Sequence, residues 1–229
     1  MKNIPLAIAP LFFLLILMSF NQDAQAETGD IALGAKISTL GVGPDITIGL
    51  LDSLNIRAAG HWGEIDVDGD GEEVDYDLDL DLRSGLVTAE WYPFSGRDFH
   101  IVAGAFINGN SFDGKADITL GFSYNIGGST YTFSEIGSLD TEIDYNSVGP
   151  YFGFGWGNPV HKDSNLSYFM DFGIAYQGSP DVSLRATGTE ATDPVFLSSL
   201  KEEEDELQDD LDDFKYYPVI SLGLTYKFF

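Results

Sequence analysis

The sequence has no cysteine, few basic residues and, after its first segment, no long hydrophobic run. Without cysteine the chain is neither a lipoprotein nor a disulfide scaffold. Lys and Arg number 11 against 37 Asp and Glu, so nucleic acid is excluded as a partner, because phosphate contacts need a basic surface. A composition that is 44% hydrophobic and 14% aromatic argues against disorder. No later stretch reaches the roughly 20 apolar residues of a spanning helix, so any membrane crossing must use strands.

The N-terminal segment has the pattern of a secretory signal. Lys2 supplies the positive charge, residues 4–20 are apolar, and Ala24-Gln25-Ala26 fits the small-x-small cleavage rule. We expect residues 1–26 to be a cleaved signal peptide and residues 27–229 to be the mature chain.

Apolar and polar residues alternate in eight later segments, which predicts an all-β protein. The fold expected is an eight-stranded antiparallel transmembrane β-barrel, with one face of each strand toward lipid. A soluble lipocalin-like barrel is the alternative, but the faces opposite the aromatics carry residues too small and polar for a soluble core. The last segment ends on aromatics, as a strand read by the barrel-insertion machinery does. The predicted strands are residues 30–39, 45–51, 54–65, 76–92, 99–112, 141–157, 166–177 and 217–229.

The connections alternate between short turns and long acidic links. Links 66–75, 113–140 and 178–216 are long, so they are expected to be external loops of an outer-membrane protein with periplasmic termini. We expect outer-membrane lipid and lipopolysaccharide around the barrel.

The last long link predicts an amphipathic helix over residues 193–214. Asp193 is a good N-cap and Pro194 suits the first helical position. Its apolar stripe is expected to be Leu197, Leu200, Leu207, Leu211 and Phe214. The acidic face predicts packing over the barrel mouth or cation binding rather than contact with lipid headgroups. A solvated lid without a specific role is the alternative.

Charged residues opposite the aromatic faces are expected to point into the lumen. The candidates for a solute path are Lys36, Arg57, Glu90 and Asp171, and the same parity also places His61, His100 and Lys227 inside. One interpretation is an internal ionic network that fills a narrow barrel. The other is a narrow, charge-lined path for a zwitterionic solute. No serine motif accompanies the three histidines, so we expect no enzyme.

An acidic hairpin tip is a second candidate site. Asp66, Asp68 and Asp70 match the start of a calcium loop, and Asp77 falls at its twelfth position. Calcium or magnesium at these external carboxylates is one interpretation, and a solvated turn is the other. The neighbouring Asp row either points outward above the membrane or follows a bulge near Ser84-Gly85.

Five short strings occur in a characteristic order along the chain. They are Tyr76-Asp77-Leu78-Asp79-Leu80-Asp81, Ala89-Glu90 with Pro93, Gly149-Pro150-Tyr151-Phe152-Gly153-Phe154-Gly155, Tyr176-Gln177-Gly178-Ser179-Pro180-Asp181-Val182 and Tyr217-Pro218-Val219. In that order they resemble the CarO-type outer-membrane proteins, a family described as ornithine-uptake porins. The resemblance implies an eight-stranded barrel with periplasmic termini and uptake of small basic amino acids. The predicted function is therefore a narrow porin-like channel for such solutes, and the alternative is a non-conducting structural or cation-binding surface barrel with a plugged lumen.

Overall fold

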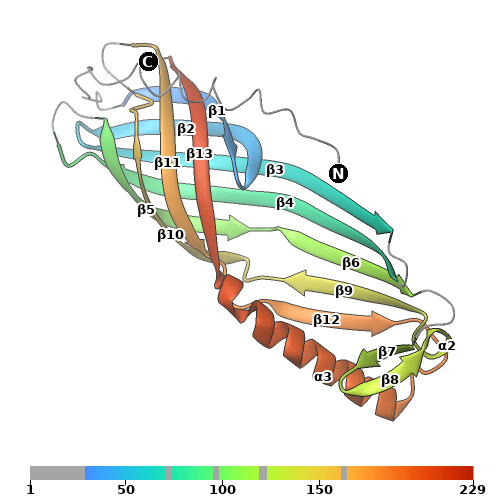
Figure 1. Ribbon diagram of the computed structural model, residues 1–229. Helices are drawn as coiled ribbons and strands as arrows, with labels where there is room; N and C mark the ends of the chain where they lie inside the picture. Colours follow the sequence, from blue (N-terminus) through green and yellow to red (C-terminus); the bar gives the residue numbers. More distant parts are fainter. Residues whose placement is uncertain (1–28, 71–73, 95–97, 119–122, 161–163, 229) are drawn as a thin grey trace.

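Eight strands close into an antiparallel ring in the computed structural model (Figure 1). The structure describes residues 29–70, 74–94, 98–118, 123–160 and 164–228, so the expected signal peptide, residues 1–26, lies outside the described residues. Pairing of the last strand with the first completes the ring and confirms the predicted fold. Around the ring, the strands are β1 (Ile31–Ser38), β2 (Gly41–Leu51), β3 (Leu54–Asp70), β4 (Val74–Trp91), β5 (Phe99–Asn108), β10 (Val148–Trp156), β11 (Leu166–Tyr176) and β13 (Tyr216–Lys227).

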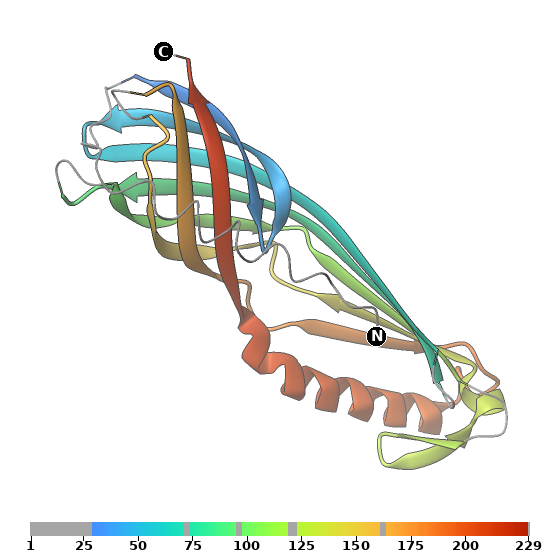
Figure 2. The same cartoon turned by 45° about the horizontal axis from the view of Figure 1, so that its top comes forward.

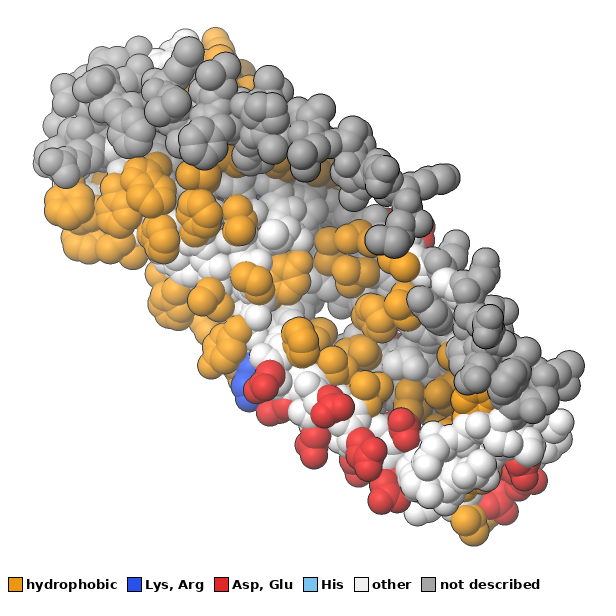
Figure 3. Space-filling view, in the orientation of Figure 1, with side chains coloured by type: hydrophobic (Ala, Val, Ile, Leu, Met, Phe, Trp, Pro, Cys, Tyr) orange, Lys and Arg blue, Asp and Glu red, His pale blue; other side chains and the backbone are white. Residues whose placement is uncertain are grey.

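The barrel wall buries polar residues and exposes apolar ones. On β10, Phe152, Phe154 and Trp156 are 63%, 45% and 42% exposed, whereas the alternate residue Tyr151 is 2% exposed. Figure 3 shows apolar side chains spread over the visible outer face of the barrel. A wall that is apolar outside and polar inside is the arrangement of a transmembrane barrel. None of the helices in the described part of the chain is long and apolar enough to cross a membrane.

Two strands continue far beyond the ring and carry a second sheet. β3 and β4 have 17 and 18 residues, against 8 in β1. Beyond the barrel they are joined by β6 (Ser111–Ile118), β9 (Ser138–Asp144) and β12 (Asp181–Ala186), in the order β3-β4-β6-β9-β12. We call this five-stranded part the extension; Figure 2 shows it projecting from one end of the barrel. Within the described residues, the expected links 66–75 and 113–140 are therefore mostly strand, whereas link 178–216 contains one strand followed by a helix.

The β3–β4 pairing settles the direction of the Asp row. Its register runs without a break from Leu54–Trp91 to Asp70–Asp75, so the bulge considered near Ser84-Gly85 is absent from this pair. Asp77 and Asp79 consequently share a face with the exposed Trp91, and Leu82 shares one with the buried Glu90. The lipid-facing side of the barrel thus becomes the acidic outer face of the extension, and the lumenal side becomes its apolar inner face.

A hairpin and a helix cap the far end of the extension. The hairpin consists of β7 (Ser123–Ile126) and β8 (Ser129–Thr132), and α2 (Phe133–Ile136) follows it. A long helix, α3 (Pro194–Leu211), runs beside β12 in Figures 1 and 2. It leads through the short 3-10 helix η1 (Asp212–Lys215) into β13.

The predicted helix is confirmed, but its buried stripe differs from the one expected. Asp193 caps it by accepting hydrogen bonds from the backbone N–H groups of Val195 and Phe196. Phe196 and Leu200 are buried against the tip hairpin and β12, with Leu207 partly buried beside them. Leu197 is 46% exposed, because the packed face begins one residue earlier than the near-heptad pattern indicated. Phe214, 61% exposed, lies in η1, where the 3.6-residue period has ended. The helix packs on the extension rather than over the barrel mouth.

Candidate functional site in the barrel lumen

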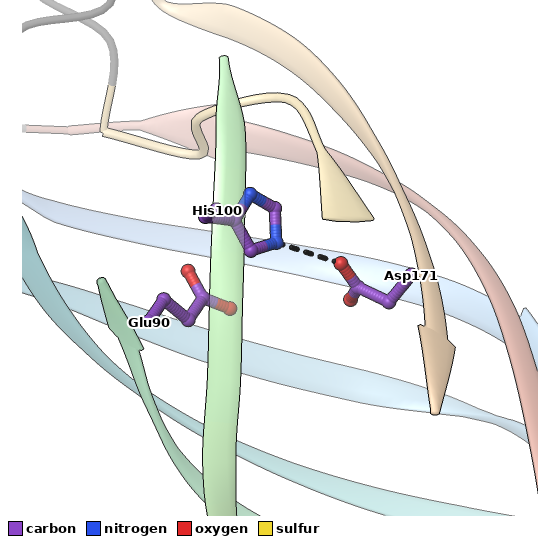
Figure 4. Close-up of side chains that lie close together, drawn as sticks. All are labelled: Glu90, His100 and Asp171. Atoms are coloured by element: carbon purple, nitrogen blue, oxygen red, sulfur yellow. Dashed lines mark hydrogen bonds and ion pairs between the residues drawn. The ribbon is translucent and has the colours of Figure 1, made fainter. Parts of the chain in front are cut away.

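Four strands aim charged side chains at one point inside the barrel. Arg57 comes from β3, Glu90 from β4, His100 from β5 and Asp171 from β11. Their exposed fractions are 3%, 0%, 0% and 6%, so each is held inside by the inward–outward alternation of its strand. Figure 4 shows Glu90, His100 and Asp171 pointing toward one another across the lumen. The predicted inward direction of these residues is therefore observed.

Arg57 bridges two carboxylates on different sides of the lumen. Its Nη1 donates to Asp171 Oδ2 at 2.7 Å, and its Nε donates to Thr47 Oγ1 at 3.2 Å. Its Nη2 forms an ion pair with Glu90 Oε1 at 2.8 Å, but the angle between the two groups is not that of a hydrogen bond. The guanidinium also lies over the Phe169 ring, 3.7 Å from the centroid. A planar, permanently charged fork suits this combination of paired and stacked contacts.

His100 extends the network by one more charge-bearing group. Its Nε2 lies 2.9 Å from Asp171 Oδ1, and its Nδ1 lies 3.2 Å from the Asp98 carbonyl oxygen. Both ring nitrogens thus face oxygen acceptors, an arrangement that fits the doubly protonated imidazolium. Gly155 makes room for this pair, because a Cβ there would lie 2.7 Å from His100 Nε2 and overlap Asp171 Oδ1. The glycine-rich string 149–155 therefore has a role inside the lumen as well as in the wall.

Two further buried charges lie close to this network. Lys36 is 5% exposed, and none of the described side chains forms an ion pair with it. Asp45 is 4% exposed, and neither of its carboxylate oxygens has a hydrogen-bond partner in the described structure. Lys36, Arg57 and a protonated His100 would match the charge of Asp45, Glu90 and Asp171. Sequence reasoning missed Asp45, although its alternation with the outward Ile46 places it inside.

A cavity beside the charged network is very small. A cavity of about 10 Å³ is lined by Lys36, Arg57, Tyr151 and Asp171 among others, which is room for about one water molecule. Toward the extension, a buried apolar layer lies in the lumen; it consists of Leu40, Leu86, Val102, Phe106, Tyr151, Ala175 and Val219.

Hydrogen-bonded polar side chains lie toward the opposite end of the lumen. The Tyr92 hydroxyl lies 3.3 Å from Glu90 Oε2 and 3.2 Å from the Gly157 carbonyl oxygen. Asn55 donates to the same hydroxyl and to Asn158 Oδ1. The charged network therefore lies between an apolar layer and a polar one. Lys227, expected in the lumen, pairs with Asp30 at 3.0 Å beside the strand ends.

The acids of this network also have the spacing of a metal site. One ligand atom from each of Glu90, His100 and Asp171 can be chosen so that all three lie within 4.8 Å of one another. Arg57 already contacts both carboxylates, so the position of a cation is taken by its guanidinium. The arrangement is thus an ion-pair network as it stands.

The first residues of the predicted calcium loop are extended. Residues 66–70 belong to strand β3, whereas this part of a calcium loop wraps around its ion; residues 71–73 of the loop lie outside the described residues. The exposed Asp66 lies opposite Asp79 on β4, and Asp77 is exposed on the same strand. The side chains of Asp68 and Asp70 lie outside the described ones. The outer face of the extension nevertheless has a hollow of about 370 Å³, lined by Asp77, Asp79, Asp113, Gly114, Lys115, Asp140, Thr141, Glu142, Ser183 and Arg185.

A serine–histidine pair in the lumen does not extend to a triad within the described residues. Ser84 Oγ lies 3.4 Å from His61 Nδ1, and His61 Nε2 has no hydrogen-bond partner there. A nucleophilic serine needs a histidine that an acid orients through its second nitrogen. The pair therefore offers no assembled machinery for acyl transfer.

Comparison with known proteins places the fold. The chain is similar to the crystal structure of Acinetobacter baumannii CarO2, with 24% identity and a TM-score of 0.58 over 87% of this chain and 98% of that one. It is also similar to Acinetobacter baumannii CarO, with 22% identity and a TM-score of 0.56 over 86% and 97% of the two chains. No family model and no curated protein sequence matches. The resemblance seen in the sequence is confirmed at the level of the fold: this chain has the transmembrane barrel fold of the CarO proteins.

Proposed function

We propose that this protein is a non-conducting outer-membrane barrel that presents the acidic extension at the cell surface. The observation that carries the proposal is the lumen, where Arg57 joins Glu90 and Asp171 across the barrel and the cavity beside them is about 10 Å³. That volume is far below what an amino acid needs, since it holds about one water molecule. The proposed biological role therefore lies in the extension rather than in solute passage.

The positions of the strand ends and of the extension support one orientation of the barrel in the membrane. β1 begins and β13 ends on the same side of the barrel, because Ala32 pairs with Lys227, and the extension projects from the other side (Figure 2). Short turns face the periplasm and long excursions face outward in outer-membrane barrels. The strand termini are thus proposed to be periplasmic, with the extension among lipopolysaccharide molecules. We propose no enzymatic activity.

A narrow channel for basic amino acids is the second candidate. Its support is the charge left unpaired beside the network: Lys36 has no ion pair and the Asp45 carboxylate has no hydrogen bond among the described residues. Unpaired charges in a lumen are costly and would be expected along an ion or amino-acid path. This function requires the Arg57 bridge to open and the apolar layer around Phe106 to move.

Solute flux into liposomes distinguishes the two functions. The purified protein would be reconstituted, and swelling would be followed in isotonic glycine, arginine and ornithine. The non-conducting barrel predicts swelling no faster than in protein-free liposomes for all three. Faster swelling with arginine or ornithine than with glycine would support the channel. Reconstitution is controlled by a known porin and by recovery of the folded barrel from the vesicles.

A further inference from the structure

The extension has two edges, and only one is covered in the described structure. At the β12 edge, α3 packs on the strand, and Glu204 Oε1 accepts the backbone N–H of Leu184 at 2.8 Å. At the β3 edge, pairing with β2 stops at Val42–Trp62, because the β1–β2 hairpin is short. Beyond that point none of the described strands pairs with the far side of residues 63–70. We call residues 63–70 the open edge.

The hydrogen-bonding groups of the open edge can be assigned from the ladder. Tyr92 donates its backbone N–H to the Ser53 carbonyl oxygen across the β3–β4 junction. Hydrogen-bonded pairs alternate along an antiparallel ladder, so odd-numbered residues of β3 bond to β4. The N–H and C=O groups of Glu64, Asp66 and Asp68 consequently point away from β4, where an added strand would lie.

The side chains of the open edge differ sharply between its two faces. Ile65 and Val67, on the inner face, are 50% and 48% exposed. Glu64 and Asp66 are exposed on the outer face. Their cross-strand neighbours on β4 continue both faces, because Ile65 pairs with Leu80 and Asp66 with Asp79. An added strand would meet an apolar row on one side and a carboxylate row on the other.

The open edge is protected against strand addition only by acidic charge, which repels an acidic strand but attracts a basic one. Natural sheets blunt exposed edges with lysine, proline or a bulge, and residues 63–70 contain neither lysine nor proline and keep an unbroken register with β4. With a rise of about 3.3 Å per residue, its eight residues offer roughly 25 Å of strand. Pairing with a second copy would set carboxylates against carboxylates, which is unfavourable, on a chain whose formal net charge is −26.

We propose that the open edge binds an extended cationic peptide segment by strand addition. The backbone groups of Glu64 and Asp66 supply the hydrogen bonds. Alternate basic side chains of the partner meet the carboxylates, and the apolar side chains between them cover Ile65 and Val67. This is β-augmentation, in which main-chain bonds give affinity and alternate side chains give selectivity. The proposal does not depend on whether the lumen conducts.

The test uses the full-length folded protein in detergent and three labelled eight-residue peptides. The probe alternates lysine and valine. One control has the same side chains with every second backbone nitrogen methylated, and the other alternates glutamate and valine. Binding is measured by fluorescence anisotropy, and protection is measured by amide hydrogen exchange. Strand addition predicts binding of the probe alone, with slowed exchange within residues 63–70.

Two variants separate the backbone contribution from charge. Asp66→Pro removes an N–H group of the open edge but leaves the ladder with β4 intact, so the Kd of the probe should rise at least about tenfold. Asp66→Asn keeps the N–H group and removes one charge, so the Kd should rise by only about threefold. The heat-dependent gel migration of each variant reports whether the barrel is folded. If Asp66→Pro does not fold, the methylated peptide still decides the question on the unmodified protein.

Three results would overturn the proposal. Equal binding of the probe and the methylated peptide would show attraction to the acidic face without strand addition. Concentration-dependent protection of residues 63–70 without any peptide would identify a second copy as the occupant. If the probe does not bind even at low salt, where charge attraction is strongest, the open edge does not bind a cationic strand.

Discussion

Removing the Arg57 side chain should be strongly destabilising. In Arg57→Met, Glu90 and Asp171 lose their 2.8 and 2.7 Å contacts with the guanidinium and stay buried. Glu90 then keeps only the Tyr92 hydroxyl and Asp171 only His100 as a partner among the contacts described above. Breaking a buried ion pair by deleting one partner costs about 3–5 kcal/mol, and two carboxylates depend on this one guanidinium. We therefore expect the free energy of unfolding to fall by about 5 kcal/mol, the upper end of that range. Urea unfolding in lipid vesicles, followed by tryptophan fluorescence, measures the change.

A matched control for Arg57→Met lies on the same barrel. Arg83 and Asp81 are also 2.7 Å apart, but their side chains are 70% and 36% exposed. Exposed pairs contribute about 0–1 kcal/mol, so Arg83→Met should change stability little. The triple change Arg57→Met with Glu90→Gln and Asp171→Asn should recover at least half of the loss, because it removes the uncompensated charges. Equal losses in Arg57→Met and Arg83→Met would refute a dry, ion-paired lumen.

Three other changes test separate parts of the structure. Gly155→Ala should destabilise the barrel by about 1–3 kcal/mol, because its methyl group would collide with the His100–Asp171 pair; Gly85→Ala, whose nearest neighbours are 3.6 Å away, is the control in the same unfolding assay. Phe196→Ala should remove about 3–5 kcal/mol of packing from α3 and speed proteolysis of residues 187–215, while Leu197→Ala, at an exposed position, should not. Millimolar calcium should raise thermal stability, and joint replacement of Asp66, Asp68 and Asp70 by Asn should remove part of that gain. Sodium at equal ionic strength should raise the thermal stability less than calcium does. An equal rise would show that the carboxylates form only a screened surface.

The barrel was predictable from the sequence because its signal is local. A strand that faces lipid on one side and lumen on the other must alternate, and Phe152, Phe154 and Trp156 do so without ambiguity. The same parity placed Arg57, Glu90 and Asp171 inside. The sequence alone does not show which of these side chains are in contact, because contact across the lumen depends on the stagger among β3, β4 and β11.

The sequence pattern does not predict the extension, because β6 and β12 lie in segments expected to be loops. The single strand expected over residues 141–157 is also divided in the structure, into β9 in the extension and β10 in the barrel. Residues 113–118 contain aspartate, glycine and lysine, which are depleted in strands, yet they pair with the overhanging β4. Residues 181–186 pair in turn with β9. Tertiary pairing decided their conformation. Asp193 and Pro194 predict the helix, and Leu200 and Leu207 of its expected stripe do pack against the extension. The stripe begins at Phe196 rather than at Leu197, because the leucine spacing alone does not show which neighbouring apolar residue is buried.

Single-channel recording in planar bilayers tests the non-conducting lumen most directly. The account predicts no discrete openings from the folded protein, with or without arginine or ornithine, and no change when the electrolyte is replaced. The triple variant at Arg57, Glu90 and Asp171, which removes the ionic bridge but leaves the apolar layer at Phe106, should also stay closed. Stable discrete openings of the unmodified protein that arginine or ornithine reduces would contradict the account.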